Sequence, residues 1–284
     1  MHKDPNTTNQ LPELRKRISI WRTERQRIAL VPTMGALHEG HLSLVDLARK
    51  QGERVIVSLF VNPKQFGANE DLDLYPRDIA GDLAQLAGRG VDLTYIPQTE
   101  QIYPPGFATT ISVSGVSQGL CADTRPHFFD GVATVVTKLF LHCQPDLAVF
   151  GEKDYQQLLV VRRLVRDLDL PIEIFGGPIV RAEDGLALSS RNAYLSKQER
   201  ACAPLLHKML VQTAQKLREG LVMPKACSPG VQTLAKAGFE LDYFELRDAL
   251  ALTPLHKLDE RPARLLIAAR LGATRLIDNI AVMR

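Results

Sequence analysis

The sequence is poor in the features that mark several classes of protein. Only 6% of its 284 residues are aromatic, and 35 basic against 32 acidic residues leave a net charge of +3. A nucleic-acid-binding surface favours a basic stripe with interleaved aromatic side chains, so we expect no nucleic-acid partner. The slight positive excess still allows a local basic pocket for phosphates.

Cysteine pairs and long apolar runs are also missing. The four cysteines form no Cys-x-x-Cys pair, which argues against a zinc site or a redox pair; they are Cys121, Cys143, Cys202 and Cys227. No apolar run approaches the roughly 18 residues of a membrane span, and the N-terminal residues lack the apolar segment of a secretory signal. The sequence therefore predicts a cytoplasmic protein with no membrane partner.

Short apolar runs rich in β-branched residues alternate with segments of helical periodicity. The runs predict strands buried on both faces over Ile28–Val31, Val55–Val61, Val91–Ile96, Leu147–Phe150 and Ile172–Phe175. The intervening segments predict helices over Leu42–Arg49, Ile79–Ala87, Val132–His142 and Tyr155–Leu168. This alternation predicts an α/β, Rossmann-like domain built on a parallel sheet, which binds its ligands at the carboxyl ends of the strands.

The pattern changes after about Ile179. A loop over Arg181–Asn192 precedes a long polar helix from about Lys197 to Glu219, and a stretch punctuated by proline and glycine, Met223–Gly230, leads to another short helix. Three strands then finish the chain, over Leu241–Arg247, Arg264–Leu271 and Arg275–Ala281. We therefore expect two domains, residues 1–180 and a smaller α+β domain of residues 181–284.

Two histidines follow the first predicted strand, in the stretch Met34-Gly35-Ala36-Leu37-His38-Glu39-Gly40-His41. A helix start offers unpaired N–H groups and a partial positive charge, and glycines let a ligand approach the backbone. Histidines three residues apart share one face of the first helical turn, so both can face the same phosphate. The alternative is that they cap the helix or face solvent. His-x-Gly-His at this place resembles the signature of the nucleotidyltransferase superfamily.

Three further segments carry polar groups beside predicted strands or between the domains. Asn62 and Gln65 follow the second strand and suit hydrogen bonding to a small polar substrate. Gly151-Glu152-Lys153-Asp154 follows the fourth: Lys153 suits phosphate oxygens, Asp154 suits ribose hydroxyls, and Gln157 lies one turn on. Leu188-Ser189-Ser190-Arg191 suits a mobile polyphosphate clamp. Each segment alone is also compatible with an ordinary turn or helix start.

Together these segments resemble the pantothenate synthetase (pantoate–β-alanine ligase) family over nearly the whole chain. The matching motifs are Val31–Gly35, Phe60–Pro63, Tyr75–Arg77, Phe150–Asp154, Leu188–Asn192 and Ala273–Asn279. The resemblance implies that ATP and pantoate form pantoyl adenylate and pyrophosphate, and that β-alanine then gives pantothenate and AMP. It also implies magnesium accompanying ATP, held by phosphates and water with no assigned protein ligand, and a homodimer.

The resemblance further implies a role for each segment. His41 stands in the position of the proton donor, and His38 and Lys153 assist as catalytic groups. The ATP site comprises Met34, Gly35, Ala36, Leu37, His38, Glu39, Gly40, His41, Gly151, Glu152, Lys153, Asp154, Val180, Leu188, Ser189, Ser190 and Arg191. The substrate candidates are Gln65, Gln157, Asn62 and Arg125. Residues 1–180 then bind ATP and pantoate, and residues 181–284 form a lid.

One motif departs from the family pattern. The family usually has Arg-Pro-x-His-Phe, whereas this chain has Arg125-Pro126-His127-Phe128-Phe129, so Phe128 stands in the histidine position.

Two other functions stay open at this point. One is a sister nucleotidyltransferase, which shares the His-x-Gly-His start. The other is a nucleotide-sensing or RNA-binding module, which binds its ligand without catalysing a reaction.

Overall fold

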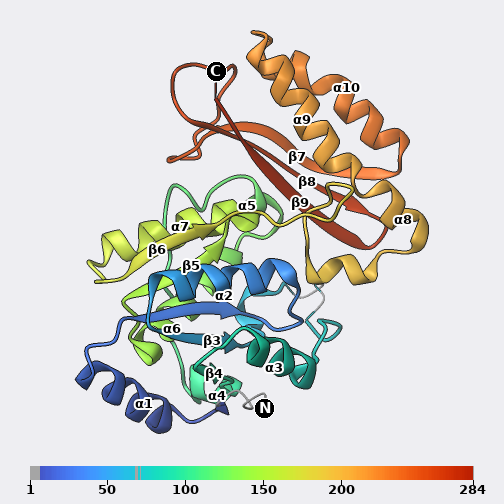
Figure 1. Ribbon diagram of the computed structural model, residues 1–284. Coiled ribbons are helices and arrows are strands. Elements are labelled where there is room, and N and C mark those ends of the chain that lie inside the picture. Colours follow the sequence, from blue (N-terminus) through green and yellow to red (C-terminus); the bar gives the residue numbers. More distant parts are fainter. Residues whose placement is uncertain (1–6, 68–69, 71, 284) are drawn as a thin grey trace. The chain divides into compact units, whose positions relative to one another are not determined.

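The computed structural model describes residues 7–67, 70 and 72–283. The chain divides into two compact units, each made of several segments (Figure 1). The first comprises Met1–Val113, Arg125–Glu152 and Val160–Pro178, and the second comprises Ser114–Thr124, Lys153–Leu159 and Ile179–Arg284. The predicted functional division between residues 1–180 and 181–284 stays a prediction. Residues 1–6 of the first predicted domain and residue 284 of the second lie outside the described residues.

The first unit is built on a six-stranded parallel sheet, which confirms the predicted α/β, Rossmann-like class. The strand order is β1-β4-β3-β2-β5-β6. The strands are β1 (Thr7–Thr8), β2 (Ile28–Thr33), β3 (Arg54–Leu59), β4 (Leu93–Tyr95), β5 (Leu147–Gly151) and β6 (Glu173–Gly177). Strands β2 to β5 are almost wholly buried, as the apolar runs predict. The edge strand β6 departs from that prediction, because only its last residue is buried.

Helices alternate with these strands along the chain. They are α1 (Leu11–Thr23), α2 (Glu39–Gln51), α3 (Ile79–Gly88), α4 (Thr99–Ile102), α6 (Phe128–Cys143) and α7 (Tyr155–Asp167), with short 3-10 turns η1 (Pro63–Gln65) and η2 (Glu152–Asp154). The end of η2 and the first part of α7, Lys153–Leu159, belong to the second unit. Helix α2 contributes Leu42, Val45 and Ala48 to a core shared with β2, β3 and β5. Among the described residues, no helix combines the length and apolar character that a bilayer span requires.

The strand order reverses direction beside β2. From β2 the chain moves outward through β3 and β4, and β5 then adds on the opposite side of β2, with Ala29 paired to Leu147 and Leu30 to Ala148. The carboxyl ends of β2 and β5 are therefore neighbours at a topological switch point. In open α/β sheets, ligands bind in the crevice at such a point.

The second unit contains a three-stranded antiparallel sheet, β7 (Phe239–Asp248), β8 (Ala263–Leu271) and β9 (Thr274–Val282). Its helices are α5 (Cys121–Thr124), α8 (Lys197–Cys202), α9 (Leu205–Arg218) and α10 (Met223–Lys236), with a 3-10 turn η3 (Ser190–Tyr194). Leu276 and Val282 of β9 join α9 and α10 in one apolar core. Because side chains alternate along a strand, Asn279 and Arg275 lie on the opposite face. This unit confirms the smaller α+β element predicted for the C-terminal region.

Proline was misjudged in two places. The predicted helix over Lys197–Glu219 is two helices, α8 and α9, separated at Ala203 and Pro204, because proline lacks an N–H and obstructs the preceding turn. The Met223–Gly230 stretch lies inside α10, where Pro224 occupies the first turn and Pro229 is tolerated in the interior. Helix α1, for which the sequence patterns gave no prediction, likewise has a proline, Pro12, in its first turn.

Candidate functional site

The turn after β2 is held by a buried carboxylate. Gly35 and Ala36 both have positive φ, +84° and 51°. Consecutive N–H groups in such a turn converge on an anion. Here that anion is Asp82 of α3, which accepts from Ala36 N at 2.9 Å and Leu37 N at 2.7 Å and is only 3% exposed. Burial raises the pKa of Asp82, and the two backbone hydrogen bonds oppose that shift.

The two histidines lie at the start of α2 and contact each other. His38 is the N-cap residue, and its Nδ1 accepts from Gly40 N at 3.1 Å. The His38 and His41 rings lie 4.1 Å apart, centroid to centroid. The two histidines therefore lie side by side, as expected, and His38 also caps the helix, which was the alternative role. The Glu39 carboxylate instead pairs with Arg89 at 2.5 Å.

Residues 62–65 follow β3 and form a polar wall, which contacts the turn after β2. Gln65 donates from Nε2 to Met34 Sδ at 3.0 Å, and its Oε1 accepts from Asn62 at 3.0 Å. Asn62 is 1% exposed and also donates to Gly131 O, while its own Oδ1 accepts from Tyr103 Oη at 2.7 Å and from Lys64 N at 3.3 Å. All the hydrogen-bonding capacity of the Asn62 amide is thus engaged within the protein. Asn62 fixes the orientation of Gln65.

Arg125 lies close to the same wall. Its guanidinium makes two bonds to Glu70, at 2.5 and 2.7 Å, and donates to Gln65 O at 3.0 Å. It also stacks on Phe128, with Cζ 3.7 Å from the ring centroid. The phenylalanine in the unusual position therefore supports the arginine that borders Gln65.

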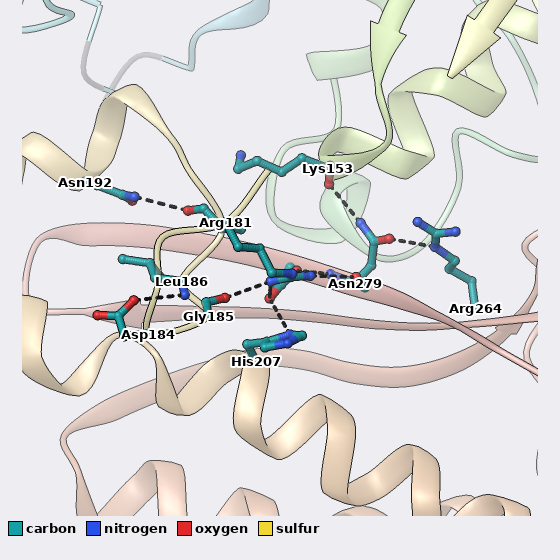
Figure 2. A network of polar contacts seen from close by, with 11 residues as sticks. Lys153, Arg181, Asp184, Gly185, Leu186, Asn192, His207, Arg264 and Asn279 are labelled. Carbon is teal, nitrogen blue, oxygen red and sulfur yellow. Dashed lines mark hydrogen bonds and ion pairs between the residues drawn. The ribbon is translucent and has the colours of Figure 1, made fainter. Parts of the chain in front are cut away.

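The end of β5 leads into the second unit. Gly151 ends the strand, and Glu152, Lys153 and Asp154 form the turn η2 before α7. Lys153 is partly buried, and its Nζ lies 3.8 Å from Asp154 Oδ2. The Lys153 carbonyl accepts from Asn279 Nδ2 at 3.0 Å (Figure 2).

The segment predicted as a loop and clamp contains a hairpin and a 3-10 turn. Residues 180–188 form a tight hairpin, with Leu188 N bonded to Val180 O at 3.0 Å and a bridge between Arg181 and Ala187. Ser189 then caps η3 through a 3.3 Å bond from Arg191 N to its hydroxyl, which places Ser190 and Arg191 in a helical turn. The hairpin is also tied by Arg181, which donates to Gly185 O at 3.0 Å (Figure 2).

Two neighbouring glutamines of α7 have different surroundings. Gln157 is partly buried, whereas Gln156 is buried and hydrogen-bonds the backbone of Val116, Gly119 and Cys121. Sequence reasoning also missed Asp82, whose position in a first helical turn suggests only a favourable helix-dipole charge. It assigned no role to Asp278 and Asn279, although they lie inside a motif that it had singled out. Their packing partners are far away in the chain, so no local pattern reveals them.

Known proteins resemble the chain over nearly its whole length. A family model described as pantoate-beta-alanine ligase matches residues 6–281. The chain belongs to the pantoate–β-alanine ligase family. A pantothenate synthetase of Rhodospirillum rubrum is 58% identical over 271 residues, covering 95% of this chain and 96% of that protein. One of Caulobacter vibrioides is 54% identical over 281 residues, covering 98% and 99%.

Solved structures of this family are similar throughout the chain. The crystal structure of pantothenate synthetase from Thermus thermophilus has a TM-score of 0.93 at 46% identity, covering 98% of this chain and 100% of that one. The pantoate-beta-alanine ligase of Francisella tularensis, solved with beta-gamma ATP and beta-alanine, has a TM-score of 0.82 at 32% identity, covering 97% of each. As a pantoate–β-alanine ligase family member, the chain is an enzyme of the ligase class.

Proposed function

We propose that this ligase condenses pantoate with β-alanine at the expense of ATP, through a pantoyl-adenylate intermediate. The observation that carries the proposal is the switch point of the first unit, where the histidine turn follows β2 and Gly151 ends the neighbouring strand β5. Family membership and the ligands of the Francisella tularensis structure support ATP and β-alanine as substrates.

The first step activates a carboxylate that is a poor electrophile. A pantoate oxygen attacks the α-phosphorus of ATP, the bond to the β-phosphate breaks, and pyrophosphate leaves. His41, with His38 beside it, stabilises the charge that develops on the phosphate, and Lys153 supplies a further positive charge. Because Asp82 already occupies the N–H groups of Ala36 and Leu37, the imidazoles and the start of α2 are the phosphate-binding parts of this turn.

The second step transfers the acyl group. The β-alanine amine attacks the pantoyl carbonyl, AMP leaves with one former pantoate oxygen, and the amine loses a proton. Gln65 and Gln157 hold pantoate in this scheme, with Asn62 and Arg125 positioning the Gln65 wall. Gly151 to Asp154, Val180 and Leu188 to Arg191 complete the nucleotide site.

Magnesium is proposed to arrive with ATP. In the described part of the chain, no cluster of three or more His, Cys, Asp or Glu side chains is arranged to hold a metal ion. The proposal rests on the chemistry of Mg²⁺, which commonly keeps water and substrate phosphates as its ligands. We also propose a homodimer located in the cytoplasm, with small molecules as its other partners.

An isotope experiment tests the adenylate. With heavy oxygen in the pantoate carboxylate, one label should appear in AMP and none in pyrophosphate. Label in inorganic phosphate, accompanied by ADP, would indicate an acyl-phosphate route. A sister nucleotidyltransferase would leave AMP joined to its acceptor, so the absence of free AMP contradicts the proposal.

A further inference from the structure

Two consecutive residues of β9 connect the polar segments of the second unit. Asp278 and Asn279 are 4% and 2% exposed, and they belong to a motif to which no function has been assigned so far. Neighbouring side chains of a strand point to opposite faces of the sheet. A rigid strand can therefore hold one segment on each face.

Asn279 holds the peptide of Lys153 on one face. Its Nδ2 donates to Lys153 O at 3.0 Å, and its Oδ1 accepts from Arg264 Nε at 2.6 Å (Figure 2). Arg264 lies over the Tyr155 ring, with Cζ 4.1 Å from its centroid. The carbonyl of Lys153 is thus held by β9, and Tyr155, the first residue of α7, contacts Arg264 of the neighbouring strand β8.

Asp278 holds the 180–188 hairpin on the other face. Arg181 makes two bonds to its carboxylate, from Nη1 at 2.6 Å and from Nη2 at 2.8 Å. His207 of α9 lies 3.6 Å from the same carboxylate. Since Arg181 also binds Gly185 O, the base and the tip of the hairpin are tied to β9 through one guanidinium. This forked geometry is specific to arginine.

We infer that Asp278 and Asn279 are positioning residues, which set Lys153 and the Val180–Arg191 segment in the geometry that binds ATP. The inference rests on the proposed function, because that function assigns both segments to the nucleotide. Neither residue touches substrate in this scheme; each acts through the segment that it holds. Small misplacements of positioned groups are costly to catalysis.

Asn279→Asp removes the Lys153 contact and keeps the Arg264 contact. The new carboxylate keeps the acceptor for Arg264, but it replaces the donor to Lys153 O with a second acceptor. We expect kcat/KM for ATP to fall by about tenfold, and the affinity for α,β-methylene-ATP, measured by calorimetry without turnover, to fall similarly. The pantoate KM should change little. The thermal unfolding midpoint should fall, because two buried acceptors then face each other, so binding is measured well below that midpoint.

Asp242→Asn is the matched control. Asp242 of β7 bonds Arg275 of β9 at 2.7 Å, and its side chain is 14% exposed, but it contacts neither ATP segment. Arg181→Lys tests the other face, since it keeps the charge and loses the fork, and it should also weaken ATP use selectively. If Asn279→Asp and Arg181→Lys affect ATP no more than Asp242→Asn does, the inference is overturned. If Asn279→Asp fails to fold, an unchanged ATP response of Arg181→Lys overturns it.

The two proposals fail differently. A wild-type protein that releases no AMP from ATP, pantoate and β-alanine contradicts the proposed function. Binding of α,β-methylene-ATP still reports on the positioning residues in that case. A wild-type enzyme that forms AMP, together with variants that bind the analogue normally, contradicts only the positioning.

Discussion

Each unit holds a segment assigned to ATP with a buried aspartate, but the two carboxylates have different partners. Asp82 accepts from two uncharged backbone N–H groups, whereas Asp278 pairs with the Arg181 guanidinium. Burial raises the pKa of Asp82 against those N–H bonds, and nearby Asp78 adds to the rise. Burial acts the same way on Asp278, but His207 and Arg181 outweigh it and lower its pKa. A buried carboxylate can thus be held by backbone dipoles or by an ion pair, and its pKa is raised in the first case and lowered in the second.

The largest effect is expected for the chemistry that the first unit positions. His41→Ala removes an imidazole from the reacting phosphate, so the rate should fall about 10²–10³-fold. ATP binding should weaken far less, because His38 and the start of α2 remain and the His41 contact is strongest in the transition state. Single-turnover formation of AMP and calorimetric ATP binding measure the two quantities. Near-normal turnover would leave His41 with a structural role only.

Breaking the Arg181–Asp278 ion pair of the second unit should lower the free energy of unfolding more than the other stability variants considered below. Asp278→Asn leaves the Arg181 guanidinium without its charge partner, and breaking such a pair costs about 3 kcal/mol. We expect a clear loss in the free energy of unfolding, measured in urea. The outcome that contradicts this reading is a variant as stable as the wild type.

The dipole-held carboxylate should matter less to folding. Asp82→Asn keeps one acceptor and turns an amide donor toward a backbone N–H, which costs about 1–3 kcal/mol. Because the substitution disturbs the turn that carries His38 and His41, kcat should fall more than ATP affinity. Equal losses in both would mean that Asp82 supports the fold without positioning the histidines.

The Gly35 turn offers a smaller test of the same contact. A Cβ at Gly35 would lie 2.9 Å from Asp82 Oδ2, at a backbone φ of +84°. Gly35→Ala should cost roughly 1–2 kcal/mol of stability. Gly88→Ala in α3 is the matched control, since a Cβ there meets no atom within 4 Å, and it should stabilise the protein by up to about 1 kcal/mol. If the two variants behave alike, the close approach at Gly35 is unimportant.

The sequence predicts features that depend on neighbouring residues. The apolar runs of β2 to β5 and the glycine turn before two histidines are local, so their positions follow from periodicity. The bond from Ala36 N to Asp82 joins residues 46 apart, and the bond from Asn279 to Lys153 joins residues 126 apart. Such partners depend on the completed fold. The break at Pro204 was missed because apolar spacing continues on both sides of it.

The smallest effect is a difference in pH dependence, and its sign separates the two carboxylates. Asp82 has a raised pKa, so above its ordinary value of 3.8 the folded chain retains a proton that the unfolded chain has lost. Its contribution to stability therefore increases as pH falls through the window above 3.8. Asp278 has a lowered pKa, so its contribution is fully present above 3.8 and is lost as pH falls below that value toward the folded pKa. The stability difference between wild type and Asp82→Asn should thus widen on acidification, whereas the difference from Asp278→Asn should stay level and then shrink. Urea unfolding of all three proteins across this range measures both. Parallel curves for the two variants would show that the dipole-held and ion-paired carboxylates do not differ as the structure indicates.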